Sequence, residues 1–241
     1  RPAKHRLMTW RGGYHGDTLG TMAISDFETG IHQKFQGVSR PHLCAALPEN
    51  PETDAALSAL LAAHAGRIAA IIVEPSVQGA GGMRFHDPSV LRRLREVADQ
   101  YGALLIFDEI FTGFGRTGAM FACEGAGVTP DIVTLSKALT GGTLPLAATV
   151  ATSKIFDAFW SDDPMQALMH GPTYMANALA CAAANASLDL FEGGERLTQV
   201  ANVERWLGEG LAPCRDLPDV TDVRVRGAIG VVELDRIDDL N

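Results

Sequence analysis

The chain has 241 residues, of which 46% are hydrophobic and 20% are charged, and its formal net charge is −9. This balance is typical of a globular protein with a sizeable core. The acidic charge, with one short basic cluster at Arg92, Arg93 and Arg95, makes nucleic acid a poor candidate partner.

The sequence also gives no support for a membrane-spanning protein, a disulfide-bonded protein or a metal-binding protein. The most apolar long stretch, 174–191, contains Asn177, Asn185 and Asp189, so we expect a buried helix and no membrane span. The four cysteines are scattered without a CxxC motif, which favours reduced thiols in a cytoplasmic protein. The seven histidines form no HxH or HExxH motif, so no metal site is predicted.

Short apolar runs alternate with helical patterns along the chain. In chain order we expect a strand at 7–10, a helix at 52–64, a strand at 68–73, a helix at 88–101, strands at 104–107, 132–135 and 146–151, helices at 175–191 and 195–211, and strands at 220–226 and 228–234. Unbroken apolar strands that alternate with helices are typical of an α/β fold, with a mostly parallel sheet and helices on both faces.

The change of pattern near residue 212 suggests two units. We expect a large domain at 1–211 and, at 212–241, the beginning of a smaller C-terminal α+β domain. The first and last residues carry no evident terminal element, so we also expect the chain to be a fragment of a longer protein.

Polar side chains follow two of the predicted strands. Asp108 ends the apolar run at 104–107, and Lys137 follows the run at 132–135. Glycine-rich loops at 79–82 and 141–142 follow other strand ends. Because ligands bind at the carboxyl ends of parallel strands, we expect a site at this edge of the sheet.

Asp108 alone leaves several interpretations open. A helix cap or a buried ion pair explains it at least as well as a functional role. Asp108 and Glu109 also resemble the acidic strand end that holds magnesium in P-loop ATPases, although the chain has no GxxxxGK[ST] motif. The GxGxxG motif at 113–118 does not directly follow a strand, as it does in a dinucleotide-binding site. A tight loop that exposes Arg116 is therefore the better interpretation.

Lys137 is flanked by apolar or small residues. A surface lysine is the usual interpretation of a single lysine. An amine beside an apolar strand end can instead react with a carbonyl group, which suits a pyridoxal cofactor. Asp108 would then pair with the protonated pyridine nitrogen of that cofactor.

Two further motifs have both a structural and a functional interpretation. Tyr14 precedes Asp17 and Thr18, either of which can cap a helix, while the Tyr14 ring can lie flat against a cofactor. Thr173 is either the N-cap of the following helix or part of an anion site for a phosphate at that helix terminus.

Taken together and in this order, five motifs resemble the class III, fold-type I pyridoxal-phosphate aminotransferases, nearly end to end: IIVEP, QGAGGM, LLIFDEIFTGFGRTG, LSKALTGG and HGPTYMANALACAAA. The motifs TWRGGYHGDTLGTMAISD and DVRVRGAIGVVE, with the proline of MHGPT, are most similar to the subgroup that makes 7,8-diaminononanoate for biotin synthesis. The substrates implied are 8-amino-7-oxononanoate and, as amino donor, S-adenosylmethionine or lysine. Another class III aminotransferase, acting on ornithine, 4-aminobutyrate or a related amine, is the alternative.

The resemblance implies a role for each matching residue in a cytoplasmic homodimer that uses pyridoxal 5'-phosphate. Lys137 would carry the cofactor and move the proton, and Asp108 would hold the pyridine nitrogen. Tyr14 and Ile110 would enclose the ring, and Tyr14 would also contact substrate. The remaining roles fall to Gly171 and Arg116 at the substrate, and to Pro172 and Thr173 at the phosphate of the neighbouring subunit. Glu74 receives no role.

The chain also departs from the family pattern. Phe111 stands where the subgroup has a small residue, and Tyr174 replaces a phenylalanine. The family's N-terminal Gly-Ser phosphate turn and its C-terminal arginine for the acceptor carboxylate are not among these residues. We therefore expect residues 1–241 alone to be inactive or nearly so.

Overall fold

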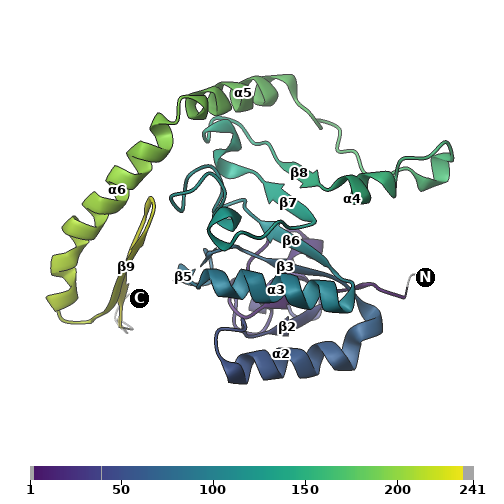
Figure 1. Ribbon diagram of the computed structural model, residues 1–241, viewed down its shortest axis with the longest axis horizontal. Helices are drawn as coiled ribbons and strands as arrows, with labels where there is room; N and C mark the ends of the chain where they lie inside the picture. Colours follow the sequence, from purple (N-terminus) through teal and green to yellow (C-terminus); the bar gives the residue numbers. More distant parts are fainter. Residues whose placement is uncertain (1–2, 39, 236–241) are drawn as a thin grey trace.

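A computed structural model describes residues 3–38 and 40–235, so the last six residues of the predicted C-terminal domain lie outside it. A central sheet of six strands runs through the molecule in the order β2-β1-β3-β6-β7-β8 (Figure 1). Its strands are β1 (Arg6–Trp10), β2 (Leu43–Ala45), β3 (Ile68–Val73), β6 (Leu104–Asp108), β7 (Ile132–Leu135) and β8 (Ala148–Ala151). Two smaller antiparallel pairs are β4 (Val77–Gln78) with β5 (Arg84–Phe85), and β9 (Val220–Arg226) with β10 (Ile229–Leu234).

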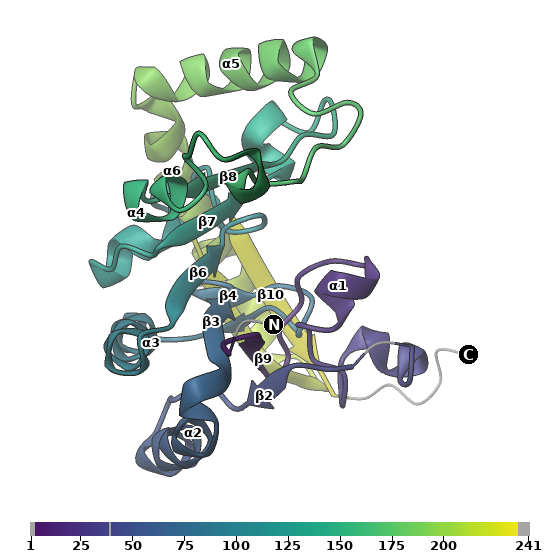
Figure 2. The same cartoon turned by 90° about the vertical axis from the view of Figure 1, so that its right-hand side faces the viewer.

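Figure 2 shows helices α2 and α3 on one face of the sheet and the short helix α1 on the other. The α-helices are α1 (Leu19–Met22), α2 (Pro51–His64), α3 (Pro88–Tyr101), α4 (Ser153–Asp157), α5 (Ala178–Glu192) and α6 (Glu195–Leu211). Short 3₁₀ helices occupy Ile31–Phe35, Ala65–Arg67, Ala122–Ala126, Lys137–Thr140, Pro164–Gln166 and Ala212–Asp216. No helix in the described ranges is long and apolar enough to cross a membrane.

The sheet is mostly parallel, which confirms the predicted fold class. Strands β1, β2, β3, β6 and β7 pair in parallel, while β8 pairs antiparallel with β7. The chain passes from β1 to β2 on one side and then returns to β3 on the other side of β1. This reversal creates a crevice between β1 and β3, where ligands of open α/β sheets gather.

The helix α3 illustrates how local sequence sets the boundaries. Asp87 accepts a hydrogen bond from Ser89 N at 2.8 Å, Pro88 begins the first turn, and Gly102 ends the helix in the left-handed conformation with φ 57°. The apolar face of α3 is buried against β3 and β6. This face belongs to a core that also includes Met8, Trp10, Leu57, Leu61, Ile71 and Phe107.

Two arginines of α3 are partly buried and join α3 to neighbouring elements. Arg93 Nε lies 2.6 Å from Asp54 Oδ1 of α2, and Arg95 Nη1 lies 2.9 Å from Asp131 Oδ2. Asp131 also accepts a hydrogen bond from Leu105 N at 2.8 Å, which ties it to strand β6. The basic cluster therefore stabilises packing between elements.

One helix boundary was predicted wrongly. Helix α5 begins at Ala178, because Asn177 accepts hydrogen bonds from the backbone N–H groups of Leu179 and Ala180 at 3.0 and 3.2 Å. Ala176, directly before this cap, has φ 54° and therefore does not have the backbone conformation of a right-handed helix. Thr173 is therefore neither the N-cap nor part of the α5 terminus.

Candidate active site

Four loops, each following a parallel strand, meet at a cavity of about 460 Å³. The loops follow β1, β3, β6 and β7, so the cavity lies at the carboxyl edge of the sheet, where the sequence places the chemistry. Of the predicted residues, Tyr14, Asp108, Ile110 and Lys137 line it together. The other lining residues are His15, Gly16, Glu74, Gly79, Ala80, Met83, Phe111 and Ser136.

Asp108 is a buried carboxylate, only 5% exposed, at the end of β6. Its Oδ2 lies 2.7 Å from Nδ1 of His15, and its Oδ1 accepts hydrogen bonds from Ile110 N and Thr134 Oγ1, both at 3.2 Å. An ionised carboxylate accepts only, so Nδ1 of His15 carries the proton in this contact. Both carboxylate oxygens are therefore hydrogen-bonded despite the burial of the side chain.

His15 was not predicted as a functional residue. Its ring is buried beside Asp108, and within the described residues its Nε2 has no hydrogen-bond partner. The only sequence signal for His15 is its position between Tyr14 and Gly16, after a predicted strand. The neighbouring residues do not indicate that the ring contacts Asp108, which lies 93 positions away.

Lys137 follows β7 and adopts a strained backbone conformation, with φ 32°. Non-glycine residues in this region cost about 1–3 kcal/mol, and they cluster at functional sites. The side chain is exposed toward the open cavity, which differs from the shielded environment expected from its apolar flanks. Its Nζ lies 5.7 Å from the centre of the Phe111 ring, so the unusual Phe111 directly adjoins the amine.

Tyr14 lies between the main cavity and a second cavity of about 380 Å³, and both are also lined by Ala80. The Tyr14 ring stacks on His32, with 5.4 Å between ring centres and 25° between planes. His32 Nε2 in turn lies 2.9 Å from Asp17 Oδ1. Burial and the nearby Asp17 carboxylate raise the pKa of Tyr14, so its hydroxyl stays protonated.

Glu74, which had no predicted role, joins two of the four loops. Its Oε1 accepts a hydrogen bond from Tyr14 N at 3.0 Å, and its Oε2 accepts one from Gly79 N at 2.9 Å. The side chain is buried, and burial raises its pKa despite these hydrogen bonds and the nearby His15. Glu74 thus fixes the loop after β1 against the loop after β3.

Glu109 is bound away from the cavity, which removes the support for a magnesium site. It is fully buried and accepts hydrogen bonds from Thr112 Oγ1 at 2.5 Å, Ala122 N at 3.1 Å and Cys123 N at 3.0 Å. Within residues 3–38 and 40–235, no group of three His, Cys, Asp or Glu side chains could hold a metal ion. Both oxygens of Glu109 are thus occupied by hydrogen bonds within the protein.

The remaining predicted residues lie away from the cavity lining. The side chain of Arg116 is exposed, and its carbonyl accepts a hydrogen bond from Ala228 N at 2.9 Å, so the 113–118 loop contacts the β9–β10 turn. Gly171, Pro172 and Thr173 are exposed in the segment between α4 and α5 (Figure 1). Tyr174, in the same segment, is 81% exposed.

Comparisons with known proteins show the family to which the chain belongs. The model of the family described as aminotransferase class-III matches residues 1–241. The adenosylmethionine-8-amino-7-oxononanoate aminotransferase of Mycobacterium leprae (strain TN) is 51% identical over 243 positions, covering 100% of this chain and 56% of that protein. The protein of the same name from Corynebacterium glutamicum is 45% identical, covering 98% of this chain and 57% of its own length.

Solved structures show the same fold. The crystal structure of adenosylmethionine-8-amino-7-oxononanoate aminotransferase from Methanocaldococcus jannaschii DSM 2661 has a TM-score of 0.89 at 32% identity, covering 96% of this chain and 54% of that one. An (S)-enantioselective omega-transaminase from Thermomicrobium roseum has a TM-score of 0.85 at 31% identity, covering 98% and 55%.

The chain spans a little more than half the length of the relatives it matches. The family match nevertheless extends over all 241 residues. On this evidence the chain belongs to the class III aminotransferases.

Proposed function

We propose that this chain is the cofactor-binding part of an aminotransferase that converts 8-amino-7-oxononanoate to 7,8-diaminononanoate, with S-adenosylmethionine as amino donor. The observation that carries the proposal is the presence of Lys137 and the buried Asp108 in the lining of one cavity. Names of relatives at 40–51% identity support the substrates.

The residues of the cavity fit pyridoxal 5'-phosphate. The cavity volume lies within the usual range for small ligands, about 300–1,000 Å³. Lys137 supplies the amine that would hold the aldehyde carbon covalently, and Asp108 supplies an acceptor for a protonated ring nitrogen. Tyr14 and Ile110 supply groups for the two ring faces.

When bound, pyridoxal phosphate supplies a protonated ring that withdraws electrons from the substrate carbon. The protein's own residues supply the charge and the proton transfer. Asp108, held by His15, keeps a negative charge at the buried end of the cavity. Lys137 Nζ can accept a proton from the carbon that carries the donor's amino group, and it can return a proton to the acceptor carbon in the second half of the reaction.

A homodimer is part of the proposal. Large apolar side chains are exposed along and beside the α4–α5 segment, namely Trp160, Met165, Leu168, Met169, Tyr174 and Leu179. An exposed apolar patch of this kind is typical of a protein interface. In such a dimer Gly171 would border the substrate, and Pro172 and Thr173 would reach the phosphate of the neighbouring subunit. Arg116 stays a candidate on the substrate side, and a cytoplasmic location is proposed with the activity.

The alternative substrate class is an ω-amine such as ornithine or 4-aminobutyrate. Solved ω-transaminases match the fold at about 30% identity, whereas the named diaminononanoate-forming relatives are 40–51% identical. A screen of amino donors and acceptors separates the two, and turnover of 4-aminobutyrate without turnover of 8-amino-7-oxononanoate would overturn the first.

Borohydride reduction followed by mass spectrometry tests the cofactor assignment. The chain has lysines at Lys4, Lys34, Lys137 and Lys154, so the labelled peptide identifies the residue. We expect the pyridoxyl mass on Lys137, its loss together with turnover in Lys137→Ala, and normal labelling in the control Lys154→Ala. A label on another lysine contradicts the assignment.

A further inference from the structure

The loop at 79–83 forms one wall of the main cavity, through Gly79, Ala80 and Met83. It connects β4 and β5, which pair over only two residues each. A ribbon of two strands this short is not stable by itself. The loop therefore depends on contacts from other parts of the chain.

The backbone around this loop is strained. Two non-glycine residues, Ser76 and Met83, have positive φ angles of 66° and 52°. Such conformations persist only where the surrounding structure holds them. Glu74 holds the start of the loop at Gly79, and Gln78 Nε2 donates to Arg11 O at 2.9 Å. Within the ribbon itself, Met83 N donates to Gly79 O at 2.9 Å and His86 N donates to Ser76 O at 3.1 Å.

Two arginines of β9 add further contacts to carbonyl groups at the loop and at the base of the ribbon. Arg224 donates from Nε to Met83 O at 3.0 Å and from Nη2 to Gly82 O at 2.8 Å. Arg226 donates from Nη1 to Ser76 O at 2.8 Å and to His86 O at 3.1 Å. The arginines thus bind the ribbon at both ends, from about 140 to 150 residues further along the chain.

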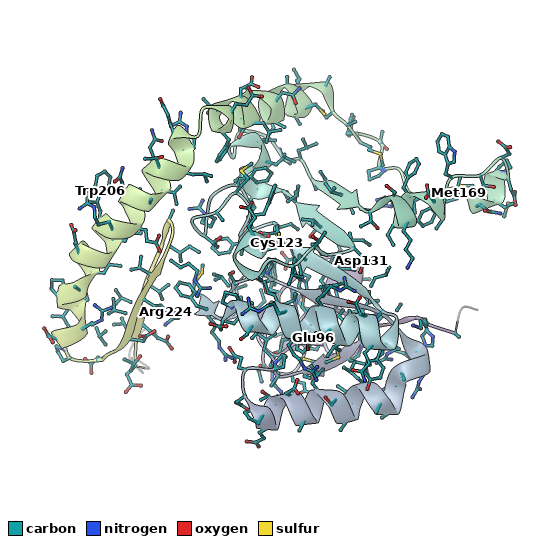
Figure 3. All side chains as sticks on the ribbon, in the orientation of Figure 1. Glu96, Cys123, Asp131, Met169, Trp206 and Arg224 are labelled. Carbon is teal, nitrogen blue, oxygen red and sulfur yellow. The ribbon has the colours of Figure 1, made fainter. Side chains whose placement is uncertain are left out.

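Phe85 of β5 contributes an aromatic surface to the same contact. The guanidinium carbons of Arg226 and Arg224 lie 4.8 and 5.8 Å from the centre of its ring. Figure 3 shows Arg224 between the β9–β10 hairpin and the body of the molecule. Guanidinium groups combine planar stacking with several fixed donors, which an ammonium group cannot reproduce.

The charges of the two arginines are balanced differently. Arg224 is also paired with Asp222 and Glu233 inside the hairpin. Arg226 forms no salt bridge in the part of the chain that the structure describes, and burial lowers its pKa. Its donors are directed at the two carbonyl groups of the ribbon. The carboxylates of Asp87 and Glu204 act on Arg226 only at longer range, so its directed contacts are best explained by the position they impose on the ribbon.

We propose that Arg224 and Arg226 are positioning residues, which hold the 79–83 loop in the shape that completes the cavity wall and so set the affinity for substrate. They act through the backbone of the loop and do not contact the reacting atoms. The hairpin thereby joins the C-terminal region to the site. The effect on substrate affinity rests on the proposed aminotransferase function, whereas the effect on loop order does not.

The test compares Arg226→Met, Arg226→Lys and the control Arg205→Met in the complete enzyme of which this chain is proposed to be the cofactor-binding part. Arg205 lies on the exposed side of α6, where it pairs with Glu209 at 3.0 Å. Hydrogen exchange of the 77–83 peptide, measured by mass spectrometry, reports loop order without any need for turnover. Loss of hydrogen bonds from a charged group should speed this exchange on the order of tenfold in Arg226→Met.

In the same variant KM for the acceptor should rise by a similar factor, with kcat changed less than about twofold. Arg226→Lys should fall between wild type and Arg226→Met, and Arg205→Met should match wild type. Unchanged exchange at 77–83, or faster exchange spread equally over β6, overturns the proposal. So does faster loop exchange with an unchanged KM. If the complete wild-type enzyme has no transaminase activity, the proposed function fails, and the exchange measurements still decide the loop contact.

Discussion

His15 Nδ1 and Asp108 Oδ2 lie 2.7 Å apart, and both side chains are buried. The imidazole provides a directed donor to a carboxylate that has little access to water. The contact fixes the orientation of the carboxylate in the cavity lining.

Asp108→Asn should keep the fold and lose most of the activity. Asparagine has nearly the same shape, but it cannot hold a pyridinium charge. We expect a loss on the order of 3 kcal/mol in transition-state stabilisation, typical of one key electrostatic group. Steady-state kinetics measure the loss, and thermal unfolding checks the fold. Near-normal turnover would show that Asp108 has a structural role only.

Two variants of His15 separate its hydrogen bond from its bulk. His15→Leu removes the donor and should lower kcat/KM by roughly tenfold to a hundredfold, as expected for a lost hydrogen bond to a charged group. His15→Asn places an amide near the Nδ1 position and should retain much of the activity. Equal losses in both variants would contradict a role for the hydrogen bond.

Asp131→Asn should weaken the fold in a pH-dependent manner. Burial alone would raise the pKa of Asp131, but hydrogen bonds from Leu105 N and Arg95 outweigh it and lower the pKa. Stability from a lowered acidic pKa is present above the unfolded value of 3.8 and is lost as pH falls through the native value. We expect a loss of about 1–2 kcal/mol at pH 7.

Urea unfolding of this variant at several pH values measures the effect. The difference from wild type should shrink as the pH falls toward and below 3.8. The exposed Asp162→Asn serves as a control with no expected change. A difference that stays constant over the whole pH range would argue against the ionic contact.

Residues 1–241 alone should turn over far more slowly than a full-length relative. The chain covers 56% of the Mycobacterium leprae protein, and side chains such as Met165 and Tyr174 are more than 80% exposed. We expect diaminononanoate formation near background and association at micromolar concentration. Assays beside the relative, with light scattering, measure both. Comparable rates would show that segments outside these residues are dispensable.

The sequence predicted the elements with strong local signals. Strands β3, β7 and β9 and helices α3 and α6 have the predicted bounds, because apolar runs, caps and glycine stops mark their ends. Strand β8 begins two residues later than expected, and its antiparallel direction could not be predicted, since an apolar run does not specify direction. The short elements β2, β4, β5, α1 and α4 lack the length that produces a periodic signal.

The candidate site also contains residues with a local sequence signal and residues without one. Asp108 and Lys137 were predictable, because a polar residue after an apolar strand is a local feature. The partners His15, Glu74 and Arg226 act across 60 to 150 residues, and no local pattern records those contacts.

The strand order has a consequence for how the cavity forms. Tyr14 and Glu74 are separated by 60 residues, and His15 and Asp108 by 93, so no single segment of the chain contains the cavity. It appears only after the distant strands have paired, which is a slow event in folding. A ligand of this cavity therefore binds the folded state alone, and it raises the unfolding temperature further as the ligand concentration increases above its Kd. Newly made chains would gain resistance to proteolysis at the moment the ligand binds.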